Sequence, residues 1–173
     1  DTQRLIVTPS SLSVTEGDST SLSVRLEYQP ANTVNVALAA NEPNLLSLGQ
    51  NQLVFTTNNY AQAQVVQVTA LEDVNLRNEV TEINLDTTGL NSESVSVNIA
   101  DNDTQTLVLS PNAITMDEGS SETIALSLSY QPNSNVTLSV SNPDSGRLTL
   151  NRSSFSFTPS NWNSPQYLTI QSL

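Results

Sequence analysis

Carboxylates are the side chains of this sequence best able to take part in catalysis or metal binding, because the other residues that usually do so are missing. The 173 residues contain 17 acidic side chains against five arginines, and the formal net charge is −12. The sequence has no histidine, no cysteine and no lysine. These absences exclude histidine-dependent triads, cysteine-bound zinc, thiol chemistry and Schiff-base formation. The chemistry that remains is the binding of a hard divalent cation, such as Ca²⁺, where carboxylates cluster.

Three acidic stretches are candidates for such a cluster. Glu16 lies in a turn, whereas Glu72-Asp73 and the pair Asp101 and Asp103 follow segments in which apolar residues alternate. If these segments are strands that end at one tip of the fold, the carboxylates would meet there and offer oxygen ligands to Ca²⁺. The alternative interpretation is that these side chains cap turns by accepting hydrogen bonds from nearby backbone N–H groups.

The elements that must position these residues occur twice, because the chain aligns with itself when Asp1 is placed on Asp103. The alignment needs no gap and keeps one register through turns and apolar positions alike. The matched segments include Pro9 with Pro111, Glu16-Gly17 with Glu118-Gly119, Tyr28-Gln29-Pro30 with Tyr130-Gln131-Pro132, and Phe55-Thr56 with Phe157-Thr158. We therefore expect two domains, residues 1–102 and residues 103–173.

The second copy ends earlier in the repeat than the first. Its last residue, Leu173, matches Leu71, so nothing in it corresponds to residues 72–102. Two apolar alternations of the first copy lie in that range, and a fold without them exposes core residues and unpaired strand edges. We expect either a segment of a longer array or a domain completed by a strand from a neighbouring molecule.

Apolar residues alternate with polar ones throughout, which predicts strands and very little helix. The clearest example is Thr20–Tyr28, where Leu22, Val24, Leu26 and Tyr28 share one face. Short strands separated by turn signals over about 100 residues describe a β-sandwich, with a small barrel as the alternative. The predicted fold class is all-β: two tandem antiparallel β-sandwich domains of immunoglobulin-like type, the second lacking its last strands.

Several segments together resemble the Calx-β family, the repeat module of sodium–calcium exchangers and of many large bacterial surface proteins. These segments are Val14-Thr15-Glu16-Gly17, Met116-Asp117-Glu118-Gly119, residues 155–162, residues 66–73 and residues 97–103. The resemblance implies a sandwich that binds calcium through loops at one tip. Carried over residue by residue, Glu16, Glu72, Asp73, Asp101 and Asp103 match the positions that ligate the metal in calcium-binding members. That tip is expected to face the second copy, so bound calcium would stiffen the joint.

The functional expectation is a non-catalytic spacer or adhesion repeat whose partners are the neighbouring repeats. A cysteine-free, acidic composition fits an extracellular bacterial surface protein, and the negative charge disfavours nucleic acid and membrane partners. One alternative is a filament subunit completed by a neighbour's strand. Another is a glycan- or protein-binding module that uses Trp162, although Trp162 and the matching Tyr60 are also expected as packing anchors. Paired carboxylates could serve a glycosidase, but a sandwich of this size offers little cleft, and we expect no enzyme.

Overall fold

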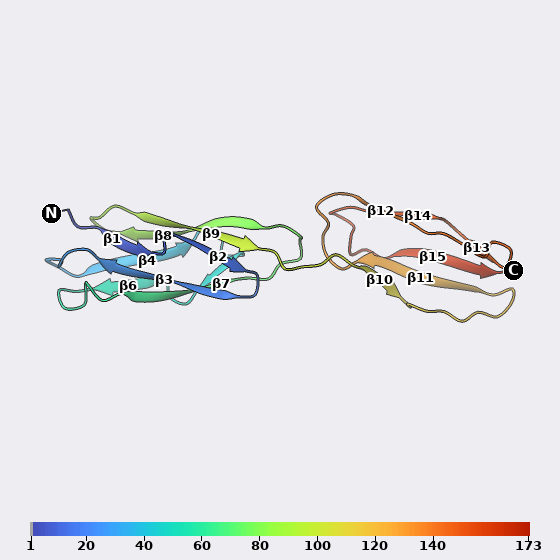
Figure 1. Ribbon diagram of the computed structural model, residues 1–173, viewed down its shortest axis with the longest axis horizontal. Helices are drawn as coiled ribbons and strands as arrows, with labels where there is room; N and C mark the ends of the chain where they lie inside the picture. The colour runs from blue at the N-terminus through green and yellow to red at the C-terminus, as the bar shows by residue number, and fades with distance from the viewer. Residues whose placement is uncertain (1) are drawn as a thin grey trace. The chain divides into compact units, whose positions relative to one another are not determined.

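The computed structural model describes residues 2–173, and these residues form strands and loops without a helix (Figure 1). The prediction of an all-β fold is confirmed. None of the described residues forms a helix with the length and apolarity that crossing a bilayer requires. The chain separates into two compact units, which are described one at a time.

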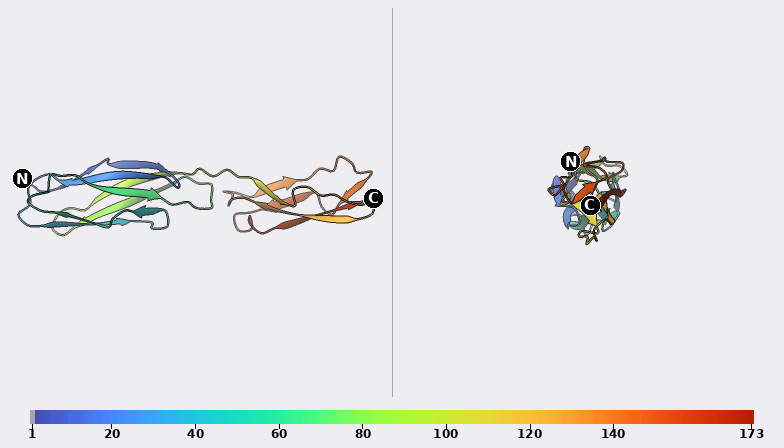
Figure 2. Two further views of the ribbon diagram at one scale, coloured as in Figure 1. Left: turned by 90° about the horizontal axis from the view of Figure 1, so that it is seen from below. Right: turned by 90° about the vertical axis from the view of Figure 1, so that its right-hand side faces the viewer.

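The first unit contains the residues up to Asp73 together with Arg77–Asn102. Its strands are β1 (Leu5–Thr8), β2 (Ser11–Thr15), β3 (Ser19–Leu26), β4 (Val34–Ala40), β5 (Leu46–Leu48), β6 (Gln52–Phe55), β7 (Gln64–Ala70), β8 (Glu79–Thr87) and β9 (Glu93–Ala100). They form a four-stranded sheet in the order β1-β3-β7-β5 and a five-stranded sheet in the order β2-β9-β8-β4-β6. Within the unit the strands lie roughly along one common axis, most of them antiparallel to their neighbours (Figure 2).

Alternating apolar side chains from both sheets share one core. The period of two places every second residue of a strand on the same face, and those residues are buried. Leu22, Val24 and Leu26 of β3 are at most 1% exposed, as are Ile83 and Leu85 of β8 in the other sheet. Each sheet therefore packs its apolar face against the other sheet, and its polar face remains exposed to solvent.

Two details of the strand prediction are wrong. β3 ends at Leu26, and Tyr28 is 40% exposed because its N–H leaves the ladder and donates to Oε1 of Gln3 at 3.0 Å. The sheets are also not wholly antiparallel, since β2 pairs with β9 in parallel. The chain changes sheet at Pro9, which has no N–H to continue the ladder between β1 and β3, so β2 runs beside β9 instead.

The second unit contains Val74–Leu76 and Asp103–Leu173. Its strands are β10 (Leu107–Ser110), β11 (Ser121–Leu128), β12 (Val136–Ser139), β13 (Leu148–Leu150), β14 (Ser154–Phe157) and β15 (Gln166–Ser172). The sheet β10-β11-β15-β13 repeats the four-stranded sheet of the first unit, and β12-β14 repeats β4-β6. The short segment Val74–Leu76 is held by the N–H of Gln131, which donates to the carbonyl of Val74 at 2.7 Å.

Candidate cation site at one end of the first unit

The turn that carries Glu16 is tied to the ends of three strands. β2 ends at Thr15, and the N–H of Glu16 then donates to the carbonyl of Ala100 at the end of β9, at 3.0 Å. The N–H of Gly17 donates to the carbonyl of Ala70 at the end of β7, at 3.1 Å. Nδ2 of Asn102 donates to the carbonyl of Glu16 at 3.0 Å. The backbone therefore holds Glu16 where β2, β7 and β9 end.

Gly17 is favoured in this turn by its backbone conformation. Its φ is +75°, in the left-handed region that residues with a Cβ rarely adopt. A Cβ at this position would also approach Oε1 of Glu72, which is the end of an exposed side chain that can rotate away. The Glu-Gly pair thus turns the chain and lets a second carboxylate approach closely.

The carboxylate of Glu16 is buried and incompletely paired. Its side chain is 2% exposed, and Oε2 has no hydrogen-bond partner. Burial raises the pKa of Glu16 to about 7, and the negative charges of Asp73, Asp101, Glu79 and Glu72 add to the rise. A buried charge without a partner is costly, so the folded chain favours either protonation of Glu16 or the arrival of a positive charge.

Other carboxylates close around Glu16. One carboxylate oxygen from each of Glu16, Asp73 and Glu79 lies within 4.8 Å of the other two. An oxygen of Asp101 also lies within 4.8 Å of one of Glu16. Ca²⁺ binds oxygens at about 2.3–2.6 Å, so two ligands on opposite sides of the ion are roughly 5 Å apart. The spacing of the oxygens of Glu16, Asp73 and Glu79 fits one Ca²⁺ ion.

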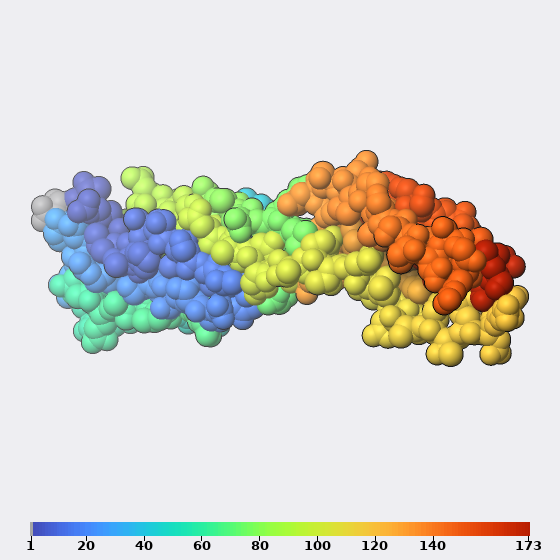
Figure 3. Space-filling view, turned by 45° about the vertical axis from the view of Figure 1, so that its right-hand side comes forward, coloured from blue at the N-terminus to red at the C-terminus, as the bar shows by residue number. Residues whose placement is uncertain are grey.

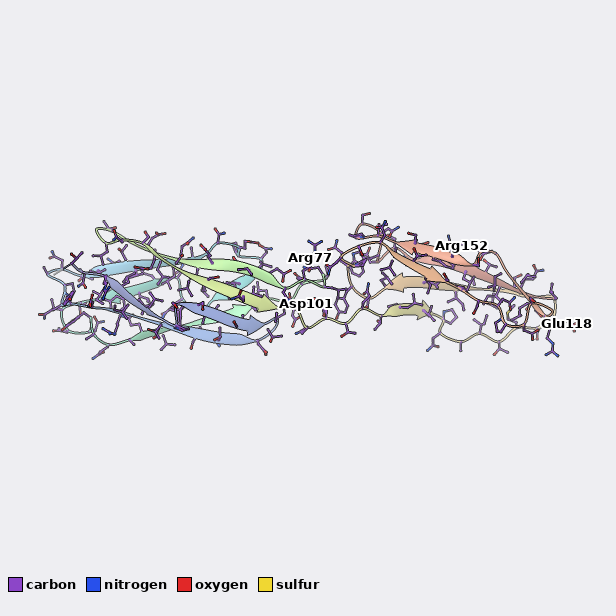
Figure 4. All side chains as sticks on the ribbon, turned by 45° about the horizontal axis from the view of Figure 1, so that its top comes forward. Arg77, Asp101, Glu118 and Arg152 are labelled. Carbon is purple, nitrogen blue, oxygen red and sulfur yellow. The ribbon has the colours of Figure 1, made fainter. Side chains whose placement is uncertain are left out.

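The structure treats the five residues predicted from the sequence differently. Asp73 and Asp101 each place a carboxylate oxygen within 4.8 Å of one of Glu16. Asp101, labelled in Figure 4, directly follows β9. Glu72 is exposed and lies at the margin, where its oxygen approaches Gly17. Asp103 belongs to the second unit.

Sequence reasoning missed Glu79. It opens β8 and pairs with Ile99 near the end of β9. Because adjacent antiparallel strands run in opposite directions, the start of β8 lies beside the end of β9, two residues before Asp101. Glu79 could have been found from the hairpin formed by β8 and β9, because its open end brings Glu79 close to Asp101. That inference requires the register of the two strands, which the sequence does not show.

The second copy of the turn gives an internal comparison. Glu118, which matches Glu16, is exposed, and Gly119 has φ +77° with open space where a Cβ would stand. Figure 4 shows Glu118 in the turn before β11. Both groups of metal-compatible carboxylates among residues 2–173 include Glu16. The turn alone therefore does not make the site; the ends of β7, β8 and β9 must surround it.

The two matching aromatic residues pack against the cores. Tyr60 and Trp162 are half-buried, one against the core of each unit. The carbonyl of Tyr60 accepts the N–H of Leu26 at 2.9 Å, and that of Trp162 accepts the N–H of Leu128 at 2.9 Å. Each residue anchors a turn to the end of a central strand.

Comparisons with known proteins assign no family. No protein-family model matches the chain, and no curated protein matches it. Among solved structures, the chain is similar to a chaperone–tip adhesin complex of CFA/I fimbriae (10% identity, TM-score 0.46, 95% of this chain and 82% of that chain). It is also similar to a Salmonella enterica SafA pilin in complex with the SafB chaperone (8% identity, TM-score 0.46, 98% and 88%). A Bacteroides ovatus GH5 xyloglucanase matches 56% of this chain (12% identity, TM-score 0.42), and the match spans only 19% of the enzyme. Similarity at this level carries no argument about function.

Proposed function

We propose that this chain is a non-catalytic structural segment of an extracellular bacterial surface protein, built from two Calx-β-like sandwich repeats. In this proposal the first repeat binds Ca²⁺ through Glu16, Asp73, Glu79 and Asp101. The proposal is supported most directly by the buried carboxylate of Glu16, whose Oε2 has no hydrogen-bond partner and is surrounded by like charges. A divalent cation bound by Glu16 would compensate the charge of its buried carboxylate.

Binding at this position would affect how the chain continues. The chain leaves the first unit after Asp73 and again after Asn102, next to Asp101. An ion bound by Asp73 and Asp101 would restrain the chain at both places where it leaves the first unit. Without the ion, the negative charges of the two carboxylates repel each other. Bound calcium would therefore make the connection between the repeats more rigid. This property suits a spacer or stalk whose partners are neighbouring repeats.

Turn capping is the alternative role for these acidic residues, and it explains part of the arrangement. Capping uses carboxylate or amide oxygens to accept backbone N–H bonds, as Oδ1 of Asn78 does from the N–H of Asp101 at 2.9 Å. It does not explain a carboxylate oxygen that is buried and accepts no bond. Glycan binding through Trp162 has less support, because the ring packs against the core of the second unit.

The experiment is calorimetric titration of the intact chain with Ca²⁺, accompanied by thermal unfolding in millimolar Ca²⁺, in Mg²⁺ and in chelator. A ligand that binds only the folded state raises its stability. We expect saturable Ca²⁺ binding and a higher melting temperature in Ca²⁺. The effect of Mg²⁺ should be weaker because Mg²⁺ demands a stricter octahedral geometry. Identical melting curves in Ca²⁺ and chelator, with no heat of binding, would exclude the calcium function.

A further inference from the structure

The segment Val74–Leu76 pairs with a loop of the second unit, and we call this segment the strap. Asn75 forms an isolated parallel bridge with Gln131. The N–H of Gln131 donates to the carbonyl of Val74 at 2.7 Å. The strap therefore adds to the loop by main-chain hydrogen bonding, as an extended peptide adds to the edge of a sheet.

The loop that accepts the strap consists of residues 129–135, between β11 and β12. Figure 3 shows the orange segment that follows β11 at one end of the second unit. Nδ2 of Asn133 in this loop donates to the carbonyl of Leu76 at 2.9 Å. Together with the bond to the first residue of the strap, this contact holds the strap at both of its ends.

The loop keeps its shape through anchors of its own. The N–H of Tyr130 donates to Oε1 of Gln105 at 3.1 Å. Nε2 of Gln131 donates to the carbonyl of Pro159 at 2.7 Å. A loop that is fixed in this way is preorganised, so it loses little conformational entropy when the strap docks.

The matching loop of the first unit shows which residue the shape of the loop does not need. Its glutamine is anchored in the same way, since Nε2 of Gln29 donates to the carbonyl of Thr57 at 3.1 Å. Ala31 occupies the position that matches Asn133. The side chain of Asn133 can therefore be removed without unfolding the loop, and its printed hydrogen bond serves the strap.

Both neighbours of the strap in the chain, Asp73 and Arg77, belong to the first unit. The chain thus enters the second unit twice, at Val74 and again at Asp103. Docking of the strap is an intramolecular event, and such a short tether gives it a high effective concentration. A few hydrogen bonds, each modest in free energy, are sufficient under that condition.

We propose that the loop of residues 129–135 is a docking site for an extended segment, and that the docked strap makes part of the first repeat a stabilising component of the second. This inference does not rest on calcium binding, because the strap docks through main-chain and amide groups. The repeats therefore have a noncovalent connection that persists in chelator. When the strap undocks, the second unit loses stability and the strap becomes accessible to proteases.

The test is limited proteolysis of the intact chain by trypsin, in chelator. The chain has five arginines and no lysine, and Arg77 directly follows the strap. A protease binds several residues on each side of the cleaved bond in extended form, so cleavage after Arg77 requires the strap to leave the loop. Arg147, whose side chain is 84% exposed in a turn of the second unit, is the internal reference. The measured quantity is the ratio of the cleavage rates after Arg77 and Arg147, each normalised to the same site in a synthetic peptide.

Asn133→Ala should raise this ratio about fivefold, because the loss of one hydrogen bond of ordinary strength raises the undocked population by that factor. Ser134→Ala, at the next and exposed position of the loop, should leave the ratio unchanged. Replacing all three strap residues by glycine should raise the ratio close to its limit in the peptide, because glycine loses more entropy on docking. Asn133→Ala in this glycine background should then change the ratio less than about twofold. Additive effects would show that Asn133 acts elsewhere.

Thermal unfolding in chelator, followed by the fluorescence of Trp162, measures the stability of the second unit. Trp162 is the only tryptophan and packs against the core of that unit. Asn133→Ala should lower this melting temperature by roughly 4–8 °C, and Ser134→Ala should not change it. An unchanged cleavage ratio in Asn133→Ala, equal ratios in the glycine variant and the wild type, or faster cleavage after Arg77 without a fall in the melting temperature would each overturn the proposal.

Discussion

Replacing Glu16 by glutamine should stabilise the protein in chelator and remove its response to calcium. Glutamine keeps the shape of the side chain but carries no charge. The pKa of Glu16 rises from an ordinary value of 4.5 to about 7. At about 1.4 kcal/mol per pKa unit this is an upper bound of roughly 3 kcal/mol of unfavourable free energy for the charged carboxylate. Solvent screens part of the field of the neighbouring charges, so we expect a gain of about 1–3 kcal/mol at pH 8.

The pH dependence has a definite sign. Because the native state holds the proton of Glu16 more tightly than the unfolded chain, stability in chelator should fall as pH rises from about 4.5 to about 7. The loss is complete above about pH 7, where Glu16 is charged in both states, and absent below about pH 4.5. In Glu16→Gln this part of the slope should disappear.

Calcium should cancel most or all of the stability advantage of Glu16→Gln over the wild type. At a free Ca²⁺ concentration of about 100 times Kd, the wild type should gain about 2.7 kcal/mol, because only the folded state binds the ion. Glu16→Gln, which lacks the central carboxylate, should gain little. The advantage of the variant, about 1–3 kcal/mol in chelator, should therefore shrink by about 2.7 kcal/mol in Ca²⁺, to a value near or below zero.

The assay is urea unfolding at pH 5 and pH 8, in chelator and in Ca²⁺, followed by circular dichroism. Glu118→Gln is the matched control, since it makes the same change in the same turn of the other repeat, where the side chain is exposed. It should alter stability by less than about 0.5 kcal/mol under all four conditions. Our reasoning is refuted if Glu16→Gln is less stable than wild type at pH 8 in chelator, or if it keeps the full calcium response.

Three further predictions concern the turn, the cores and the ion. Gly17→Ala and Gly119→Ala should each lose about 1 kcal/mol in urea unfolding, because both glycines have positive φ; equal stability to wild type would contradict this. Phe157→Ala should cost about 3–5 kcal/mol and abolish the transition reported by Trp162, whereas the matching Phe55→Ala should leave that transition in place. The affinity for Ca²⁺, measured by titration calorimetry, should rise between pH 5.5 and pH 8 as the buried carboxylate loses its proton; a flat profile would count against Glu16 as a ligand.

Most strands could be predicted from the sequence because apolar and polar residues alternate within each of them. Leu22, Val24 and Leu26 alternate with polar residues, and this local pattern suffices to indicate a strand with one buried face. The pattern failed at Tyr28, which continues the alternation although the strand has ended. Periodicity records which residues are apolar, but it does not show that the N–H of Tyr28 leaves the ladder and donates to the side chain of a distant residue, Gln3.

The candidate site was predictable only in part for a similar reason. Glu16, Asp73 and Asp101 stand at segment ends, and a turn motif or an acidic pair marks them in the sequence. Glu79 carries no such mark, because it is one acidic residue at the start of a strand. Its place beside the others depends on the register between β8 and β9, which is a contact between strands.

The sequence by itself determined the all-β class, the repeat that relates the two copies, the absence of histidine, cysteine and lysine, and the acidic residues available for a cation. These properties follow from composition, period and self-similarity, which need no knowledge of distant contacts. Only the tertiary structure decided that Glu16 is buried while Glu118, in the same motif, is exposed. The physical reason is that the charges around Glu16 come from residues 72–102, far away in the chain, and this range has no counterpart among residues 103–173.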